Sequence, residues 1–403
     1  MLTNDLLDSA RGLADDIVSL RRAIHKEPEL GLETPKTLAK VKAALERLPL
    51  EWKEGPSCTG AIATLVGTGS GPGAERRVLL RGDMDALPMD EKTNLEFAST
   101  IPGRMHACGH DTHTAMLAGA AQLLCAKRDQ FAGTVDFMFQ PGEEGYHGAR
   151  FMLEDGLIDP LPDAAFALHI MPNAPFGVIG GRPGPLLAAA DQFTIEVQGQ
   201  GGHASMPHDC VDPIPGAAAI VSAIQAMVTR RFKATSAVVV TVTQIHAGTT
   251  FNVIPDGVTL NGTIRTLSAE HREKVHTLIA ETASTTAAAH GLTASCNIER
   301  GFPVTICDPR AVELGSTVAK DIGGEEAWLA LPDPIMGAED FSYVLEKVPG
   351  AMFFLGVAQE GSDWTACCAI HSPRMHVDEN ALPRGTAVLS GCALKFLEEG
   401  FAE

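Results

Sequence analysis

The sequence predicts an α/β protein whose first domain, built on a mostly parallel sheet flanked by helices, is interrupted by an inserted α+β domain. Its 403 residues exceed what one hydrophobic core usually covers. Short apolar strands alternate with helices at both ends of the chain, which favours a parallel sheet. The middle follows the β-α-β-β-α-β order of a ferredoxin-like unit. We expect the first domain at 1–187 and 302–403 and the inserted domain at 188–301.

Hydrophobic periodicity defines the elements before the insertion. Apolar residues at three- to four-residue spacing, from Leu13 to Ile24, predict the opening helix. Asp111 is the expected N-cap of the third helix. Helices are predicted over about 6–27, 37–48 and 111–127, and strands over 61–66, 77–81, 134–140 and 164–170.

The pattern changes inside the insertion, where DQFTIEVQ alternates polar and apolar residues as a half-buried strand does. Strands are predicted over 191–198, 236–245, 257–267 and 292–300, and helices over 212–230 and 269–290. The chain then returns to the first pattern. A helix is predicted near 310–322, a strand over 351–357 and a final helix through Phe396.

Composition restricts the partners and the compartment. The chain carries 31 basic and 50 acidic residues, a net charge of −19, which disfavours nucleic acid and anionic membranes as partners. No apolar stretch approaches the roughly 18 residues of a membrane helix, and the N-terminal residues do not resemble a signal peptide. Nine scattered cysteines indicate reduced thiols. We therefore expect a cytoplasmic protein.

The stretch MHACGHDTHTAML, residues 105–117, concentrates metal-binding side chains. It contains Cys108 and three histidines, His106, His110 and His113, around Asp111. Thiolate and imidazole ligands at this density indicate a transition-metal site, with zinc or manganese as the expected metal. These residues cannot complete a hydrolytic metal site alone, so further ligands are expected downstream.

Polar residues also follow the predicted strands at their carboxyl ends, where open α/β sheets bind ligands. Asp83 and Asp85 follow one strand, Glu143 and Glu144 follow another, and His169 closes a third. Each has a simpler structural interpretation: an Asp-rich turn, a solvated acidic pair and a core histidine. Adjacent buried carboxylates repel each other unless a cation holds them. Their repeated position favours a shared metal site.

Two divalent ions that share one thiolate need about five protein ligands. The candidates are Cys108, His110, Glu144, His169 and, after the insertion, His371. Paired ions about 3.5–4 Å apart lower the pKa of a bound water and polarise a carbonyl group. Glu143 would be the general base. Asp85 would orient a ligating histidine, and Asp83 could act similarly.

Taken together, the sequence motifs resemble a known family. RGDMDALPM, HACGHDTHTAML, QPGEEG, LHI, GGHASMPH, FNVIPD, GTIRT, GAEDF and IHSP are similar to the dinuclear-metal aminoacylase and carboxypeptidase superfamily. More narrowly, they resemble its hippurate hydrolase and auxin-conjugate (IAA-amino acid) amidohydrolase subfamily. The resemblance runs from Arg21 to Pro373 in family order. It is specific because many short blocks agree in both spacing and order.

The resemblance implies a catalytic domain and a smaller lid domain through which subunits usually dimerise. HACGH implies that Cys108 and His110 are ligands, with Cys108 standing where relatives outside the subfamily carry a bridging Asp. Those relatives carry a ligating histidine at the position of Asp83, so here that duty passes to His110. QPGEEG implies Glu143 as base and Glu144 as ligand.

The resemblance also assigns residues later in the chain. LHI and IHSP imply His169 and His371 as ligands. After IHSP we expect an aromatic residue and an acid, but Arg374, Met375 and His376 follow instead, which leaves the packing behind His371 open.

Three residues of the inserted domain gain roles through the same resemblance. GGHASMPH implies that His203 reaches a neighbouring subunit's active site and stabilises the tetrahedral oxyanion. FNVIPD implies Asn252 in substrate binding, and GTIRT implies Arg265 near the substrate carboxylate, which a guanidinium binds bidentately. The alternatives are a polar loop residue for His203 and a surface charge for Arg265.

The predicted function is hydrolysis of the amide bond of N-acyl amino acids, whether hippurate-like, N-acetyl or other acyl or aryl conjugates. A metal-bound water attacks, Glu143 is the base, and a carboxylic acid and a free amino acid are released. A dipeptidase or N-acetyl-amino-acid deacetylase of the same fold is an alternative. A metal- or redox-binding protein with Cys108 as a reactive thiol is a more distant one, because no Cys-x-x-Cys exists and adjacent Cys367 and Cys368 suit an ordinary disulfide poorly. Substrate and native metal stay open.

Overall fold

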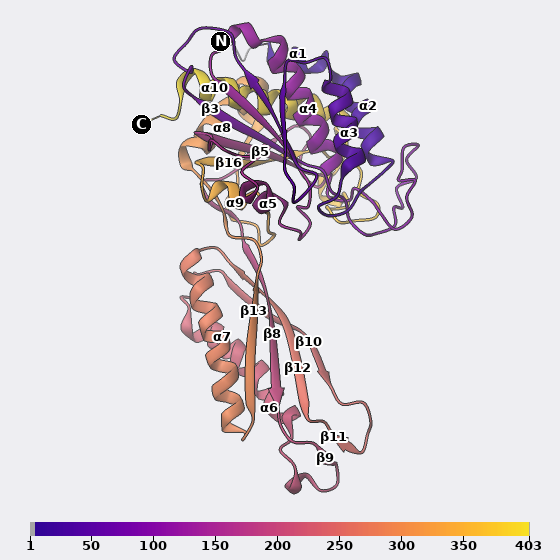
Figure 1. Ribbon diagram of the computed structural model, residues 1–403, viewed down its shortest axis with the longest axis vertical. Coiled ribbons are helices and arrows are strands. Elements are labelled where there is room, and N and C mark those ends of the chain that lie inside the picture. The colour runs from indigo at the N-terminus through magenta and orange to yellow at the C-terminus, as the bar shows by residue number, and fades with distance from the viewer. Residues whose placement is uncertain (1–4, 403) are drawn as a thin grey trace. The chain divides into compact units, whose positions relative to one another are not determined.

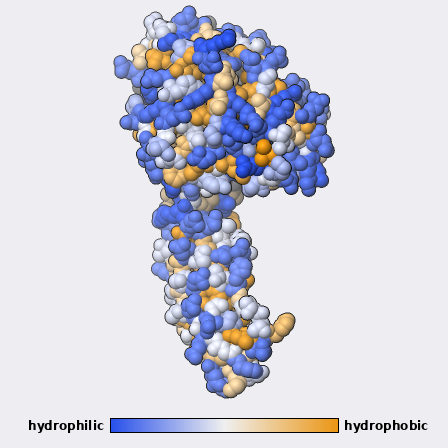
Figure 2. All heavy atoms as spheres, turned by 45° about the vertical axis from the view of Figure 1, so that its right-hand side comes forward, coloured by the Kyte–Doolittle hydropathy of each residue, from blue (hydrophilic) through white to orange (hydrophobic). Residues whose placement is uncertain are grey.

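The computed structural model describes residues 5–402 and divides the chain into two compact units, each described here by itself (Figure 1). Unit 1 is formed by the described residues up to Leu186, by 306–333 and by those from Asp340 onward. Unit 2 is formed by 187–305 and 334–339. The surfaces of both units in Figure 2 are predominantly hydrophilic, with hydrophobic residues scattered between. Among the described residues, no helix is long and apolar enough to cross a membrane.

Unit 1 is built on an eight-stranded sheet in the order β1-β2-β4-β3-β5-β16-β6-β15. Its four central strands, β4, β3, β5 and β16, run parallel, which confirms the predicted mostly parallel sheet. The strands are β1 (Glu51–Glu54), β2 (Ala61–Val66), β3 (Arg77–Asp83), β4 (Thr134–Gln140), β5 (Ala164–Met171), β6 (Ile179–Gly181), β15 (Trp328–Ala330) and β16 (Gly350–Gly356). A separate pair joins β7 (Gly184–Leu187) to β14 (Thr305–Cys307).

Helices α4 and α10 pack against each other and against β3. The Ala- and Gly-rich sequence of α4 permits this close approach, and nearly all its residues are buried. The helices of unit 1 are α1 (Leu6–Arg11), α2 (Ala14–His25), α3 (Pro35–Leu45), α4 (His110–Ala126), α5 (Gly148–Glu154), α8 (Pro309–Gly323), α9 (Ser342–Leu345) and α10 (Leu382–Glu399). The single helix predicted over 6–27 is wrong, because the first helix ends at Arg11 and α2 starts anew at Ala14.

Unit 2 contains a four-stranded antiparallel sheet in the order β10-β12-β8-β13, with α6 and α7 packed on it and on each other (Figure 1). Inward residues of β8 and β12 alternate with more exposed ones, as the period of a strand requires. Its elements are β8 (Ala189–Gln198), α6 (Pro213–Arg231), β10 (Val238–Ala247), β12 (Gly257–Thr266), α7 (Ala269–Ala289) and β13 (Thr293–Arg300), in the predicted ferredoxin-like order, with a small pair of β9 (Gly202–His203) and β11 (Val253–Ile254).

A buried ion cluster lies at the start of β8, where the chain enters the sheet of unit 2. The Asp191 carboxylate accepts hydrogen bonds from Arg272 Nε and Nη2 at 2.9 and 2.6 Å and from Gly301 N at 2.9 Å. His276 Nε2 lies 2.7 Å from the same carboxylate. Burial opposes its ionisation, but His276 and Arg272 outweigh burial and hold the pKa of Asp191 well below its ordinary value. The cluster ties β8, α7 and the end of β13 together.

We predict that Asp191→Asn destabilises unit 2 by about 3–5 kcal/mol, because Arg272 loses its buried counter-ion. The depressed pKa means that the stabilisation is complete at neutral pH and is lost as the pH falls below about 4. Urea unfolding from pH 7 to pH 3, with hydrogen exchange in β8 and β13, measures this. Glu273→Gln, which breaks an exposed pair with Arg300, is the control and should cost no more than about 1 kcal/mol. Equal effects of the two variants would contradict the prediction.

Candidate metal centre

A tight turn places two candidate ligands at the start of α4. Gly109 is the N-cap of this helix and has a left-handed backbone, with φ at 89°. A Cβ atom there would lie 2.5 Å from Ile170 Cγ1, so only glycine fits. Asp111 was expected as the N-cap, but that prediction is wrong: the helix starts at His110, and the Asp111 carboxylate lies 2.7 Å from Arg21 Nε.

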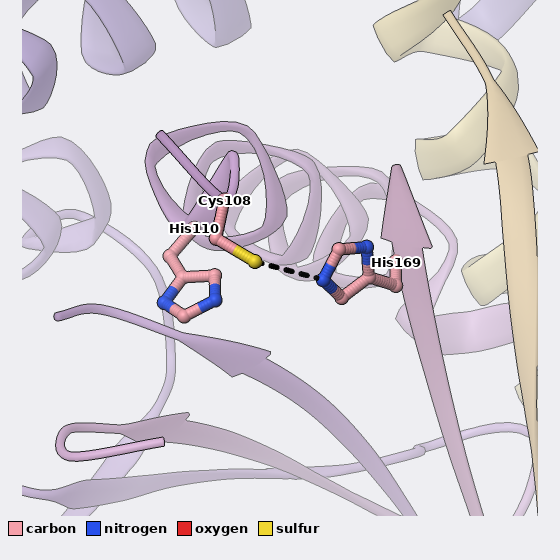
Figure 3. Close-up of side chains that lie close together, drawn as sticks. All are labelled: Cys108, His110 and His169. Carbon is pink, nitrogen blue, oxygen red and sulfur yellow. Dashed lines mark hydrogen bonds between the residues drawn. The ribbon is translucent and has the colours of Figure 1, made fainter. Parts of the chain in front are cut away.

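The structure brings all five predicted ligands together within unit 1. Their metal-binding atoms form two groups, each within 4.8 Å: Cys108 with His110 and His169, and Cys108 with Glu144 and His371. Cys108 Sγ lies 3.3 Å from His169 Nε2, and Figure 3 shows this sulfur between the His110 and His169 rings. Because both groups share Cys108, the arrangement suits two ions with a thiolate between them.

His110 provides the test of whether a cation fits. Its Nδ1 lies 2.8 Å from the backbone oxygen of Asp85, to which it donates a hydrogen bond. Its Nε2 is buried without a hydrogen-bonding partner among residues 5–402. Carboxylate oxygens of Asp83, Glu143 and Glu144 lie 3.5, 3.9 and 4.0 Å from this nitrogen. A buried ring nitrogen facing three carboxylates is the donor set that a divalent cation requires.

Asp85 connects the two ligand-bearing segments, which extends the role predicted for it. Its carboxylate accepts hydrogen bonds from the backbone of Glu143 at 2.9 Å and of Glu144 at 3.0 Å. Its backbone oxygen accepts the hydrogen bond from His110 Nδ1, and its carboxylate Oδ1 lies 3.5 Å from the same nitrogen. One residue therefore fixes the start of α4 relative to the turn after β4.

Asp83 and His113 form a support behind the ligands. His113 Nε2 accepts a hydrogen bond from Ile170 N at 2.8 Å, so its Nδ1 carries the proton shared with Asp83 Oδ1 at 2.7 Å. Arg81 binds the other oxygen of Asp83, also at 2.7 Å. Both ring nitrogens of His113 are thus occupied, which agrees with the expectation that it orients its neighbours.

His371 reaches the cluster from a strained loop. Its φ of 64° is unusual for a residue with a side chain, and its backbone nitrogen donates to Ala107 O at 2.6 Å. Its Nε2 lies 3.3 Å from Glu144 Oε1. Of the three residues that follow IHSP, Met375 is buried, whereas Arg374 and His376 are exposed. Cys108 and Glu144 raise the pKa of His371 to about 10.

The remaining predicted residues belong to unit 2. Exposed His203 lies on β9 opposite Val253, and its Nδ1 accepts a hydrogen bond from Ser205 N at 3.1 Å. Neutral His203 therefore carries its proton on Nε2, as an oxyanion donor must. Asn252 is next to Val253, and its backbone oxygen accepts from Ala204 N at 3.1 Å.

Arg265 lies on β12 and is half-buried. Burial lowers the pKa of its guanidinium, and Asp191 is the one charge that acts in the opposite direction. The described residues provide no hydrogen bond or ion pair to this guanidinium. It is therefore available to bind the carboxylate of a ligand.

Comparison with known proteins identifies the family. A family model described as "Peptidase family M20/M25/M40" matches residues 79–395. The chain belongs to peptidase family M20. An "IAA-amino acid hydrolase ILR1-like 2" of Arabidopsis thaliana is 37% identical over 389 residues, 96% of this chain and 86% of that protein. An "N-acetylcysteine deacetylase" of Bacillus subtilis is 38% identical over 384 residues, 95% of this chain and 97% of that protein.

A solved structure supports the same assignment. The YXEP protein of Bacillus subtilis, described as a dinuclear metal binding peptidase from the M20 family, superposes with a TM-score of 0.84 at 34% identity. The alignment covers 96% of this chain and 99% of that chain. This M20 protein is therefore a metal-dependent hydrolase that acts on amides, as predicted. The family resemblance inferred from the motifs is confirmed.

Asp340, in the GAEDF motif, is a further residue of the site to which the sequence pattern assigned no role. Its Oδ1 accepts hydrogen bonds from Gln140 Nε2 at 2.7 Å and Arg81 Nη2 at 3.1 Å. Its Oδ2 accepts from Ala149 N at 2.9 Å. These contacts fix the turn between β4 and α5, which carries Glu143 and Glu144. The GAEDF motif could have indicated a role for Asp340. The residues that its carboxylate binds, however, lie 191 to 259 residues away in the chain.

We predict that metal binding to this M20 centre strengthens as the pH rises. The raised pKa of His371 means that an ion must displace a proton from the ring, which costs less free energy at high pH. Equilibrium competition between a chelator and the protein from pH 6 to pH 9 measures the affinity, and a pH-indicator dye measures the protons released. In a His371→Ala control, metal affinity should depend less strongly on pH. A pH-independent affinity would contradict the prediction.

Proposed function

We propose that this M20 enzyme hydrolyses the amide bond of N-acyl amino acids and releases a carboxylic acid and a free amino acid. The observation that carries the proposal is the cluster in which two metal-ligand groups share Cys108. We propose Cys108, His110, Glu144, His169 and His371 as the ligands of two zinc or manganese ions. When bound, such ions supply activation of water and polarisation of the acyl carbonyl.

Glu143 is the proposed general base. It is buried, its backbone is fixed by Asp85, and its carboxylate Oε2 lies 3.9 Å from His110 Nε2, beside the ligands. From there it can take a proton from the attacking water and deliver it to the amine that leaves. Its neighbour Glu144 lies 3.3 Å from His371, which suits a ligand instead.

His203, Asn252 and Arg265 are the proposed substrate contacts, and their spacing supports a shared active site. Arg265 pairs with Ala190 near one end of the β8–β12 ladder, whereas His203 follows the other end, at Gln198. Eight strand residues separate these ends, roughly 25 Å. An N-acyl amino acid has only a few bonds between its carboxylate and its amide carbonyl. Arg265 and His203 of one chain therefore cannot both bind one such substrate.

A homodimer resolves this conflict, because the partner copy can supply His203 and Asn252 to a site where Arg265 binds the carboxylate. Unit 2 has surface suited to association: β10 is an edge strand with exposed Val239 and Ile245. Phe251, next to Asn252, is fully exposed. We propose that copies associate through unit 2, which then acts as both lid and dimerisation domain.

Two alternatives remain to be compared with the proposed reaction, a redox protein and an N-acetyl-amino-acid deacetylase. Burial raises the pKa of the Cys108 thiol although His110 lies beside it, so the metal-free thiol is a poor nucleophile, which argues against a redox protein. Deacetylation of N-acetyl amino acids remains within the proposed reaction, since the acyl group is then acetyl. All nine cysteines are free thiols, and a thiolate ligand needs reducing conditions, which supports a cytoplasmic enzyme.

We predict that Glu143→Ala retains both ions and loses turnover by about 10²–10⁴-fold, because only proton transfer is removed. Metal content is measured by elemental analysis. Turnover is measured as free amino acid with ninhydrin on N-acetyl, N-benzoyl and N-indoleacetyl amino acids. Glu144→Ala is the matched control and should lose metal as well as activity. The base assignment is refuted if Glu143→Ala keeps more than a few per cent of the wild-type rate, and the proposed substrate class fails if the wild type cleaves none of the panel.

We predict that two inactive variants complement each other. In a mixed dimer of Glu143→Ala and His203→Ala chains, one site combines Glu143 of one copy with His203 of the other. One of the two sites in each mixed dimer is complete, so the purified mixed dimer should show about half of the wild-type activity. Co-expression of differently tagged chains followed by tandem purification isolates the mixed dimer for assay. Mixed dimers no more active than the two parents would exclude a shared site.

A further inference from the structure

A buried arginine connects two segments of the chain that carry ligands of the metal centre. Arg21 lies on α2 and is 2% exposed. Its Nε is 2.7 Å from Asp111 Oδ2, and its Nη1 is 3.1 Å from Glu379 Oε1. Asp111 directly follows the proposed ligand His110. Glu379 lies on the segment that follows His371, so one guanidinium spans both segments.

His25, one helical turn after Arg21, completes the cluster. Its Nδ1 lies 2.8 Å from the same Asp111 oxygen, and its Nε2 lies 3.1 Å from Glu91 Oε1. Glu91 is held in turn by the backbone nitrogen of Ser99 at 2.7 Å. The ring of Phe97 covers the Arg21 guanidinium at 4.6 Å. Each ionisable group of the cluster therefore lies within 3.1 Å of an ion-pair partner.

Stability alone does not explain this cluster. Asp111 is fully buried. The free energy needed to remove an arginine and a carboxylate from water is about as large as the free energy of their attraction. Apolar residues of similar size would therefore stabilise the fold equally well. What a buried ion pair provides is a defined geometry. Here the geometry is that of the first turn of α4 relative to the segment after His371, and these segments also touch where His371 N donates to Ala107 O.

We propose that Arg21 is a positioning residue of the metal centre: its ion pairs with Asp111 and Glu379 set the separation of Cys108 and His110 from His371. The inference rests on the metal ligands of the proposed function and adds a determinant of their spacing. Arg21 touches none of the five ligands, so it acts through the two carboxylates. Loss of Arg21 leaves the ligands present but moves His371 relative to Cys108, and the group that contains both loses affinity for its ion.

The neighbouring arginine provides a matched control. Arg22 also binds Glu379, with Nε at 3.0 Å from Oε1. Its side chain is 46% exposed, and Glu379 is the one carboxylate with which it forms an ion pair among residues 5–402. Replacing Arg22 therefore removes a charge of the same kind from the same carboxylate without disturbing Asp111.

The experiment compares Arg21→Met, Arg21→Lys and Arg22→Met with the wild-type chain, each loaded with cobalt(II). Chelator competition gives the affinity of each ion, and the thiolate-to-cobalt absorption band reports the geometry around Cys108. We expect Arg21→Met to weaken one of the two ions by about 10–100-fold and to shift this band. Arg21→Lys should recover part of the affinity, and Arg22→Met should match the wild type. Thermal unfolding of each variant checks that it is folded.

If Arg21→Met does not fold, His25→Gln replaces it, because this variant removes the second partner of Asp111 and should also weaken one ion selectively. The inference about Arg21 would be overturned if the folded Arg21 or His25 variant kept the wild-type metal affinity and spectrum. It would also be overturned if Arg22→Met lost the same metal affinity. Neither result would contradict the proposed ligand set. A wild-type chain that binds fewer than two ions, or shows no thiolate band, would instead overturn the proposed ligand set. The two failures are thereby distinguished.

Discussion

The metal centre is organised by a concentration of buried negative charge that the protein cannot leave uncompensated. Asp83, Glu143 and Glu144 place carboxylate oxygens within 4.0 Å of a single imidazole nitrogen, His110 Nε2. Burial of the His110 ring disfavours its charged form, yet Asp83 and Cys108 raise its pKa well above the ordinary value. Protons on His110 and His371 supply part of the compensating positive charge. A divalent ion meets the same electrostatic demand with ligands already in place.

The parallel sheet determines where this charge accumulates. β3 pairs in parallel with both β4 and β5, so the carboxyl ends of all three strands reach one edge. Asp85 follows β3, the Glu143–Glu144 pair follows β4, and His169 lies two residues before the end of β5, so all of them lie at this edge. Backbone hydrogen bonds from Glu143 and Glu144 to Asp85 then fix the two turns relative to each other. Fold and site are therefore connected through main-chain geometry.

These relations explain what could be predicted from the sequence. β2 and β4 match their predicted bounds, because a short apolar run between turn residues is a local signal. Strand ends then indicated Glu144 and His169 as members of one group. The ion pairs of Asp111 gave no local signal, since His25 lies 86 residues away. Asp111 was therefore assigned to a cap, which its position before a helical pattern favoured. Three-residue strands such as β6 were missed because they are too short for periodicity.

The shared thiolate gives the two proposed metal positions different chemistry. One combines Cys108 with two imidazoles, His110 and His169, whereas the other combines it with Glu144 and His371. Thiolate and imidazole favour zinc, and a carboxylate oxygen makes the second position more acceptable to manganese. The first position is buried, while His371 is half-exposed, with 52% of its side chain accessible. An ion at the second position should therefore exchange more readily, so its affinity depends most on how firmly the His371 segment is held.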